Sequence, residues 1–170
     1  MLRQLRETGP VVLVPLAWTF VTAVHLGLAS DHALFVSHLV MATIIVAFSA
    51  LSWTDMDSGV LLAWRRVLLA GLVVTLAGVA GFLVPSLEGP LFALSIYGWM
   101  VIPAAGLAYT GRRVTEAPWL YLLGAALSGL GLVVYAGSSV AGVGIGATVV
   151  GLTLVNVGQT VGIANAVYQY

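Results

Sequence analysis

The sequence contains no cysteine and no lysine, and it has few charged residues of any kind. Without cysteine the chain cannot form disulfides, thiolate metal sites or a cysteine nucleophile. Without lysine it cannot form a lysine Schiff base, which excludes a retinal pump of the usual kind. Charged residues make up 7% of the chain, against about 25% in soluble proteins. No basic run is present, so we expect no nucleic-acid partner.

The residues that are present are mostly apolar, with 61% hydrophobic side chains and a mean hydropathy of +1.09. A water-soluble fold of 170 residues could not bury so much apolar surface. A transmembrane helix needs about 20 apolar residues. Six segments meet this requirement, at residues 9–29, 33–53, 60–84, 91–110, 118–137 and 141–166. We therefore expect an all-α membrane protein, a six-transmembrane-helix bundle in the lipid bilayer that forms one polytopic domain over residues 1–170.

The arginines predict the orientation of these spans. If the N-terminus is inside the cell, every cation lies on the cytoplasmic side, and these cations are Arg3, Arg6, Arg65, Arg66, Arg112 and Arg113. Asp31 and Glu88 then lie outside, as the positive-inside rule favours. We expect both termini to be cytoplasmic in a multi-pass protein of a prokaryotic plasma membrane. The first segment has full span length and five more follow, which favours a retained helix over a cleaved signal.

Two segments share the opening Arg-Arg-Val, at residues 65–84 and 112–135, and each continues into a span with several glycines. Three tandem helical hairpins would produce this layout. Selection for cytoplasmic arginines would produce the same rhythm without a repeat. Both explanations stay open from the sequence.

The sixth span carries a stripe of small residues, formed by Gly144, Gly151, Gly158 and Gly162. At 100° per residue these four glycines lie within about 40° of one another. Small residues let two helix backbones approach closely inside a membrane. The stripe therefore predicts a tight contact, either with another helix of this chain or in self-association with a second copy.

Polar side chains on the same span have two interpretations. Asn156, Gln159 and Thr160 lie more than one turn from the predicted inner boundary, and Thr22 is a polar residue of the first span. They could hydrogen-bond across helices and fix the packing, because lipid offers amides no partner. They could instead line a polar cavity for a solute or an ion.

The three histidines lie within residues 25–38, across the predicted external turn. Two antiparallel helices would bring His25 and His38 to the same depth in the outer leaflet, with His32 at the boundary. If the stripes that contain them face each other, the two imidazoles converge. They could then ligate a haem or a transition metal, relay protons, or each hydrogen-bond a neighbouring carbonyl or hydroxyl. The sequence does not identify a cofactor.

The predicted spans contain no acidic residue, which disfavours a cation-driven transporter. No GxSxG nucleophile motif is present, and we favour a protein that is not an enzyme. The leading hypothesis is a haem- or metal-binding or accessory subunit of a membrane complex, with other membrane subunits as partners. The alternatives are a small-solute channel or transporter and a non-catalytic helical scaffold.

Overall fold

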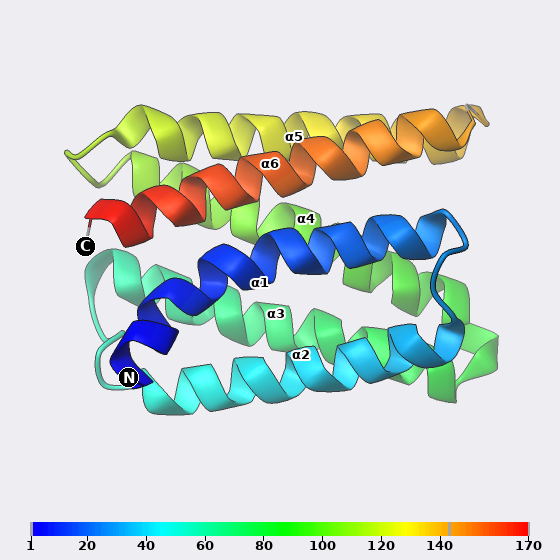
Figure 1. Cartoon of the computed structure of the whole chain (residues 1–170), viewed down its shortest axis with the longest axis horizontal. Coiled ribbons are helices and arrows are strands. Elements are labelled where there is room, and N and C mark those ends of the chain that lie inside the picture. The colour runs from blue at the N-terminus through cyan, green and yellow to red at the C-terminus, as the bar shows by residue number, and fades with distance from the viewer. Residues whose placement is uncertain (1, 143, 170) are drawn as a thin grey trace. The chain divides into compact units, whose positions relative to one another are not determined.

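The protein is mostly helical over the part of the chain that the structure describes. A computed structural model describes residues 2–142 and 144–169, with side chains described from Gly9 onward. Over these residues no strand occurs (Figure 1). The elements are α1 (Leu2–His25), α2 (Asp31–Leu51), α3 (Gly59–Leu83), the short 3₁₀ helix η1 (Pro85–Leu87), α4 (Glu88–Gly111), α5 (Pro118–Ala141) and α6 (Ile145–Gln169).

Each predicted span coincides with one of the six α-helices. The largest difference is at the N-terminus, where α1 begins at Leu2 rather than at residue 9. The residues before Gly9 are mostly good helix formers, so the helix extends beyond the apolar stretch. Ser30 is the N-cap of α2, and its hydroxyl accepts a hydrogen bond from the Ala33 amide at 3.2 Å.

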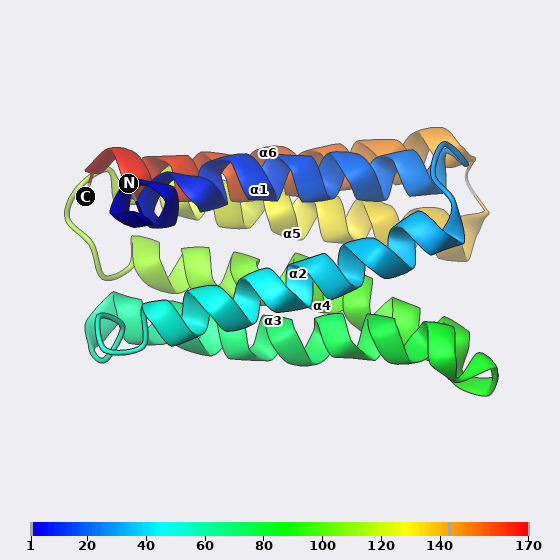
Figure 2. The same cartoon turned by 60° about the horizontal axis from the view of Figure 1, so that its bottom comes forward.

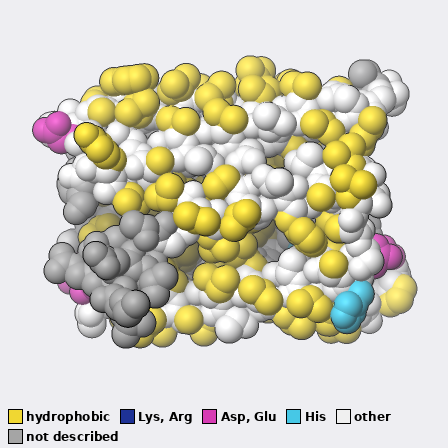
Figure 3. Space-filling view, viewed as in Figure 1, with side chains coloured by type: hydrophobic (Ala, Val, Ile, Leu, Met, Phe, Trp, Pro, Cys, Tyr) yellow, Lys and Arg dark blue, Asp and Glu magenta, His cyan; other side chains and the backbone are white. Residues whose placement is uncertain are grey.

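Within the described residues, five helices are long and apolar enough to cross a membrane, and α1 contributes a shorter apolar stretch, Gly9–His25. The helix α2 has the highest mean hydropathy among the five, at 2.2. Hydrophobic side chains are exposed along the helices, and the Asp and Glu side chains visible in Figure 3 lie at helix ends. Exposed apolar surface of this kind suits a lipid environment.

The described residues form two compact units. Unit 1 comprises Met1–Ala29 and Pro103–Tyr170, and unit 2 comprises Ser30–Ile102. Unit 1 therefore holds α1, α5, α6 and the end of α4, while unit 2 holds α2, α3 and the beginning of α4. Proline cannot donate the helical hydrogen bond to the residue four positions earlier, and Pro103 lies where α4 passes from one unit to the other. A single domain over the whole chain stays a prediction.

In unit 1 the helices α5 and α6 lie side by side, with α1 along α6 (Figures 1 and 2). Glycines bring the α5 and α6 backbones together. A Cβ atom at Gly124 would lie 2.5 Å from the carbonyl oxygen of Gly158. A Cβ atom at Gly131 would lie 2.5 Å from that of Gly151. Contacts this close leave no room for a side chain at Gly124 or Gly131.

In unit 2 the helix α2 lies along α3, and side chains fill the space between α3 and α4. A Cβ atom at Gly71 would lie 2.7 Å from the indole ring of Trp99. Phe82 of α3 and Phe92 of α4 pack edge to face, with ring centroids 4.7 Å apart. Partly buried aromatic rings therefore pack against glycines of α3 in this unit.

Candidate functional site

His25 is the last residue of α1 and has a hydrogen-bond partner at each ring nitrogen. Its Nδ1 lies 2.9 Å from the carbonyl oxygen of Val21, and its Nε2 lies 2.9 Å from the hydroxyl of Tyr135 on α5. A carbonyl oxygen can only accept, so Nδ1 carries a proton, and in the neutral imidazole Nε2 then accepts from the Tyr135 hydroxyl. The two rings also meet edge to face at 5.6 Å. His25 thus ties α1 to α5 within unit 1.

His38 of α2 has the same arrangement within unit 2. Its Nδ1 lies 2.9 Å from the Leu34 carbonyl, and its Nε2 lies 3.5 Å from the hydroxyl of Ser95 on α4. The imidazole fills the space where Gly78 of α3 lacks a side chain, and a Cβ atom there would overlap it. The ring of Phe82 packs against it at 5.9 Å.

The carbonyl bonds of the two histidines fix the tautomer with a lone pair on Nε2. Metal-binding histidines use the same arrangement, in which the second ring nitrogen donates to a carbonyl and orients the ring. Both lone pairs face a hydroxyl group of the same unit. Among the described residues, no group of three or more His, Cys, Asp or Glu could hold a metal ion. Convergence of His25 and His38 joins residues of different units and stays a prediction.

The helices α3 and α5 share a sequence pattern. Each histidine packs against the residue that occupies the same position of this pattern in its own unit. The pattern is a glycine, a hydroxyl residue at i+4, a second glycine at i+7 and an aromatic residue at i+11. Its members are Gly71, Thr75, Gly78 and Phe82 in α3, and Gly124, Ser128, Gly131 and Tyr135 in α5. The aromatic residue is the one that contacts the histidine. This register differs from the one in which the two Arg-Arg-Val segments align.

The hydroxyl residue of the pattern makes the same bond in both helices. Thr75 donates to the carbonyl of Gly71 at 2.8 Å, and Ser128 donates to the carbonyl of Gly124 at 2.7 Å. Both side chains are almost completely buried. A hydroxyl in a membrane helix satisfies itself in this way without needing a second helix. In unit 2, the indole N–H of Trp99 also donates to the Thr75 hydroxyl at 2.9 Å.

Gln159 of α6 is 2% exposed, and its amide oxygen accepts a hydrogen bond from the indole N–H of Trp18 on α1 at 2.9 Å. Trp18 is itself 5% exposed. The Thr22 hydroxyl, one turn further along α1, donates to the Trp18 carbonyl at 2.9 Å. An indole–amide bond therefore links α1 to α6 at the centre of unit 1.

Asn156 lies three positions before Gln159 on α6, and Thr160 lies one position after it. The amide nitrogen of Asn156 lies 3.5 Å from both the Pro15 carbonyl and the Thr19 hydroxyl. The Thr160 hydroxyl donates to the amide oxygen of Asn156 at 3.2 Å. The longer contacts of Asn156 therefore join α6 to α1, whereas the Thr160 bond stays within α6. Whether any of these polar groups also meets a solute stays a prediction.

Three glycines of the α6 stripe pack inside unit 1. Gly151 and Gly158 contact the α5 backbone, and Gly162 contacts the side chain of Leu107 on α4. Gly144 precedes α6, and a Cβ atom there would have no atom within 4 Å. The expected tight helix contact is therefore made within the chain. Self-association through the stripe stays a prediction.

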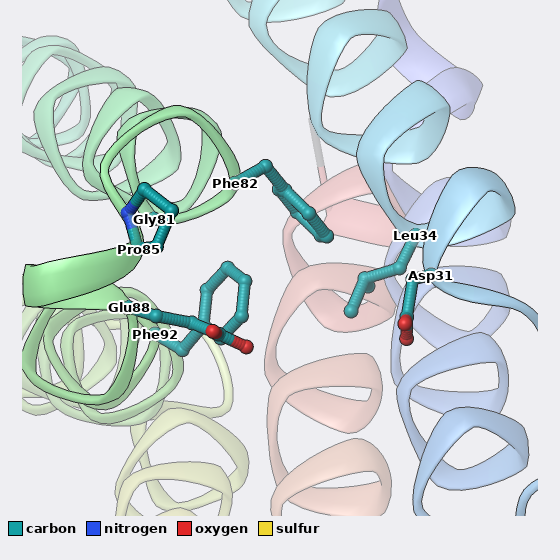
Figure 4. Close-up of a pocket in the computed structure, with 7 residues that line it drawn as sticks. All are labelled: Asp31, Leu34, Gly81, Phe82, Pro85, Glu88 and Phe92. Carbon is teal, nitrogen blue, oxygen red and sulfur yellow. The ribbon is translucent and has the colours of Figure 1, made fainter.

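Unit 2 also contains a small pocket of about 130 Å³ near the beginnings of α2 and α4. Figure 4 shows the carboxylates of Asp31 and Glu88 reaching toward it from α2 and α4, with the ring of Phe82 between them. Both acidic residues were expected at the outer boundary. The remaining lining residues are Leu34, Gly81, Pro85 and Phe92.

The sequence does not predict the partners of the candidate residues, which include Tyr135 for His25. It also gives no prediction for Trp99 and Thr75. A signal was available, because a tyrosine or tryptophan at membrane depth needs a partner for its O–H or N–H group. The choice among several acceptors depends on helix packing, which the sequence alone did not specify.

No family model, curated protein or solved structure matches the chain.

Proposed function

We propose that this chain is a multi-pass integral membrane protein that serves as a non-catalytic accessory subunit of a membrane complex. The proposal places both termini in the cytoplasm of a prokaryotic cell, because all six arginines then lie on the cytoplasmic side. Five long apolar helices support the membrane location.

The main observation in support of the accessory role is the hydrogen bond between Trp18 and Gln159. A buried amide at membrane depth either serves packing or marks a site for a ligand. Here its oxygen is occupied by an indole N–H of the neighbouring helix. This polar pair of unit 1 is therefore used to hold α1 and α6 together, as a scaffold requires.

The low burial of α2 also supports the presence of a membrane partner. Only 11% of its most apolar stretch is buried, against 28–33% for the other four candidate spans. Most of this helix is open to lipid or to another membrane subunit, whereas a self-contained bundle would bury more of each helix. An accessory subunit would contact its partner through such an exposed apolar face.

The test is native purification of the tagged chain from its own membranes in a mild detergent. The accessory role predicts a defined complex with one membrane partner at fixed stoichiometry, without solute flux when the chain alone is placed in liposomes. A chain that purifies alone, or that conducts a solute in a manner lost in Asn156→Leu and Gln159→Leu, contradicts the accessory role. The second result would favour the channel alternative.

A second candidate function is nitrogen ligation of a haem or a transition metal, and the histidine tautomers favour it. His25 and His38 both present an unprotonated Nε2, which is the atom a metal would bind. Binding would have to displace the hydroxyl that faces each Nε2, that of Tyr135 or Ser95.

Visible spectroscopy and metal analysis of the purified protein test this candidate. A Soret band or stoichiometric metal that is lost in His25→Ala or His38→Ala would support it, and His32→Ala is the matched control at an exposed position. Absence of both signals from protein purified without chelators would remove it.

A further inference from the structure

The turn between α4 and α5 carries the exposed arginines Arg112 and Arg113 with little to neutralise them. Both follow the end of α4, and the only acidic residue of the turn is Glu116. No ion pair joins the described side chain of either arginine to Glu116. Two guanidinium groups on one short turn create a local positive charge.

Arg113 is held by an aromatic ring of the preceding helix. Its guanidinium lies over the ring of Tyr109, with the central carbon 5.2 Å from the ring centroid. A cation–π contact uses the flat face of a guanidinium and leaves the N–H groups at its edge free to donate. The edge of an arginine fits two oxygens of a phosphate at once. Tyr109 therefore orients Arg113 without consuming its donors.

The corresponding turn in unit 2 is built differently. Arg65 also lies over an aromatic ring, that of Trp53 at 4.5 Å, but it donates one N–H to the Trp53 carbonyl at 3.2 Å. The loop before it contains two carboxylates, Asp55 and Asp57. Two arginines also lie beside this turn, Arg65 and Arg66 of α3, but the two carboxylates lower its net charge, so it serves as an internal comparison.

The surface next to Arg112 and Arg113 combines exposed leucine side chains with an exposed tryptophan ring. Trp119, in the first turn of α5, is 62% exposed, and Leu122 and Leu123 of the next turn are exposed as well. Tryptophan and tyrosine favour the headgroup level of a bilayer. A ligand that fits this surface has an anionic group for the arginines and a hydrocarbon part for the leucines.

We propose that the α4–α5 turn binds the phosphate of an anionic phospholipid, with Arg112 and Arg113 as its ligands and the acyl chains along α5. This inference rests on the proposed membrane location. Free phosphate would satisfy the same arginines, but it would gain nothing from Trp119 and the exposed leucines. The lipid is therefore the occupant that the whole surface fits.

The experiment uses native mass spectrometry of the full chain in detergent micelles that contain phosphatidylglycerol or phosphatidylcholine. We expect preferential retention of phosphatidylglycerol, and a loss of affinity of about fivefold for each arginine replaced by glutamine. The test variant is Arg112→Gln/Arg113→Gln. The matched control is Arg65→Gln/Arg66→Gln, which removes the same charge from the other turn and should weaken binding less.

Tyr109 gives a second readout. Tyr109→Leu should weaken retention of phosphatidylglycerol because Arg113 loses its support, and Tyr109→Phe should preserve it because the ring remains. Thermal unfolding of each variant checks that the fold is intact. Equal loss in both arginine double variants would overturn the proposal, since it would show attraction by net charge alone.

Inorganic phosphate and an alkaline wash separate the remaining outcomes. Displacement of the lipid by millimolar phosphate would overturn the proposal in favour of a free-anion site. Release of the chain from membranes by alkaline carbonate would contradict the membrane location, which is a separate failure. Retention in the membrane with no preference for phosphatidylglycerol would contradict only the lipid site.

Discussion

The two units use the same helix pattern for different kinds of packing. In α5 the glycines of the pattern meet the α6 backbone at Gly158 and Gly151, whereas in α3 they meet the side chains of Trp99 and His38. A backbone cannot withdraw from an added methyl group, but a side chain can change its rotamer or be replaced. The difference teaches that a glycine motif specifies close approach without specifying what approaches.

The largest effect is expected at the backbone contacts of unit 1. Gly131→Ala should destabilise the protein by about 2–3 kcal/mol, because the new methyl group would overlap the Gly151 carbonyl and overpacked cores relax poorly. Thermal or denaturant unfolding in detergent measures the change. Gly137→Ala is the matched control on the same helix, where a Cβ atom would meet nothing within 4 Å. An equal loss in both variants would contradict the packing that we describe for α5.

A smaller effect is expected at the side-chain contacts of unit 2. Gly71→Ala should cost about 1–2 kcal/mol because it presses on the Trp99 ring. Part of this cost should be recovered in the double variant Gly71→Ala/Trp99→Leu, measured against Trp99→Leu alone. The same recovery is not possible at Gly131, because the group that faces it is a backbone carbonyl and no substitution makes it smaller. If Trp99→Leu gives no recovery, the contrast between the two units fails.

The indole–amide bond of unit 1 should contribute about 0.6–1 kcal/mol, the range found for polar contacts between membrane helices. A double-mutant cycle with Trp18→Phe and Gln159→Leu isolates this coupling energy from the effect of each single change. Both residues are buried, so each single variant also alters packing. A coupling energy of zero would mean that the bond between Trp18 and Gln159 does not hold α1 to α6.

The smallest effects are expected at the two histidines, and they should differ between the units. Tyr135→Phe removes a bond of 2.9 Å to His25, whereas Ser95→Ala removes a contact of 3.5 Å to His38. We expect a loss of about 0.5 kcal/mol for the first and almost none for the second. Unfolding measurements on both variants test this ranking, and the reverse order would show that the two sites are not as described.

Much of the helical architecture could be predicted from the sequence, because apolar runs of sufficient length leave few alternatives in a chain with 7% charge. The six α-helices lie where the spans were expected. The grouping into two units was not predicted. It depends on which helix each glycine faces, and a glycine stripe is the same in sequence whether it meets a backbone or a ring.

The candidate site was predictable only by residue type. His25 and Gln159 could be recognised as polar groups that need partners at membrane depth. Their partners, Tyr135 and Trp18, are distant in the sequence and were fixed by helix packing. The sequence likewise placed Arg113 at a membrane boundary but gave no sign of its contact with Tyr109.

The most direct test of a packing role for the histidines is the ¹⁵N spectrum of their side chains in lipid nanodiscs. We predict that His25 and His38 carry the proton on Nδ1 and accept a hydrogen bond at Nε2. The Tyr135→Phe variant should change the Nε2 signal of His25 and leave the Nε2 signal of His38 unchanged. A proton on Nε2, or an Nε2 signal shifted by a bound metal, would contradict the account.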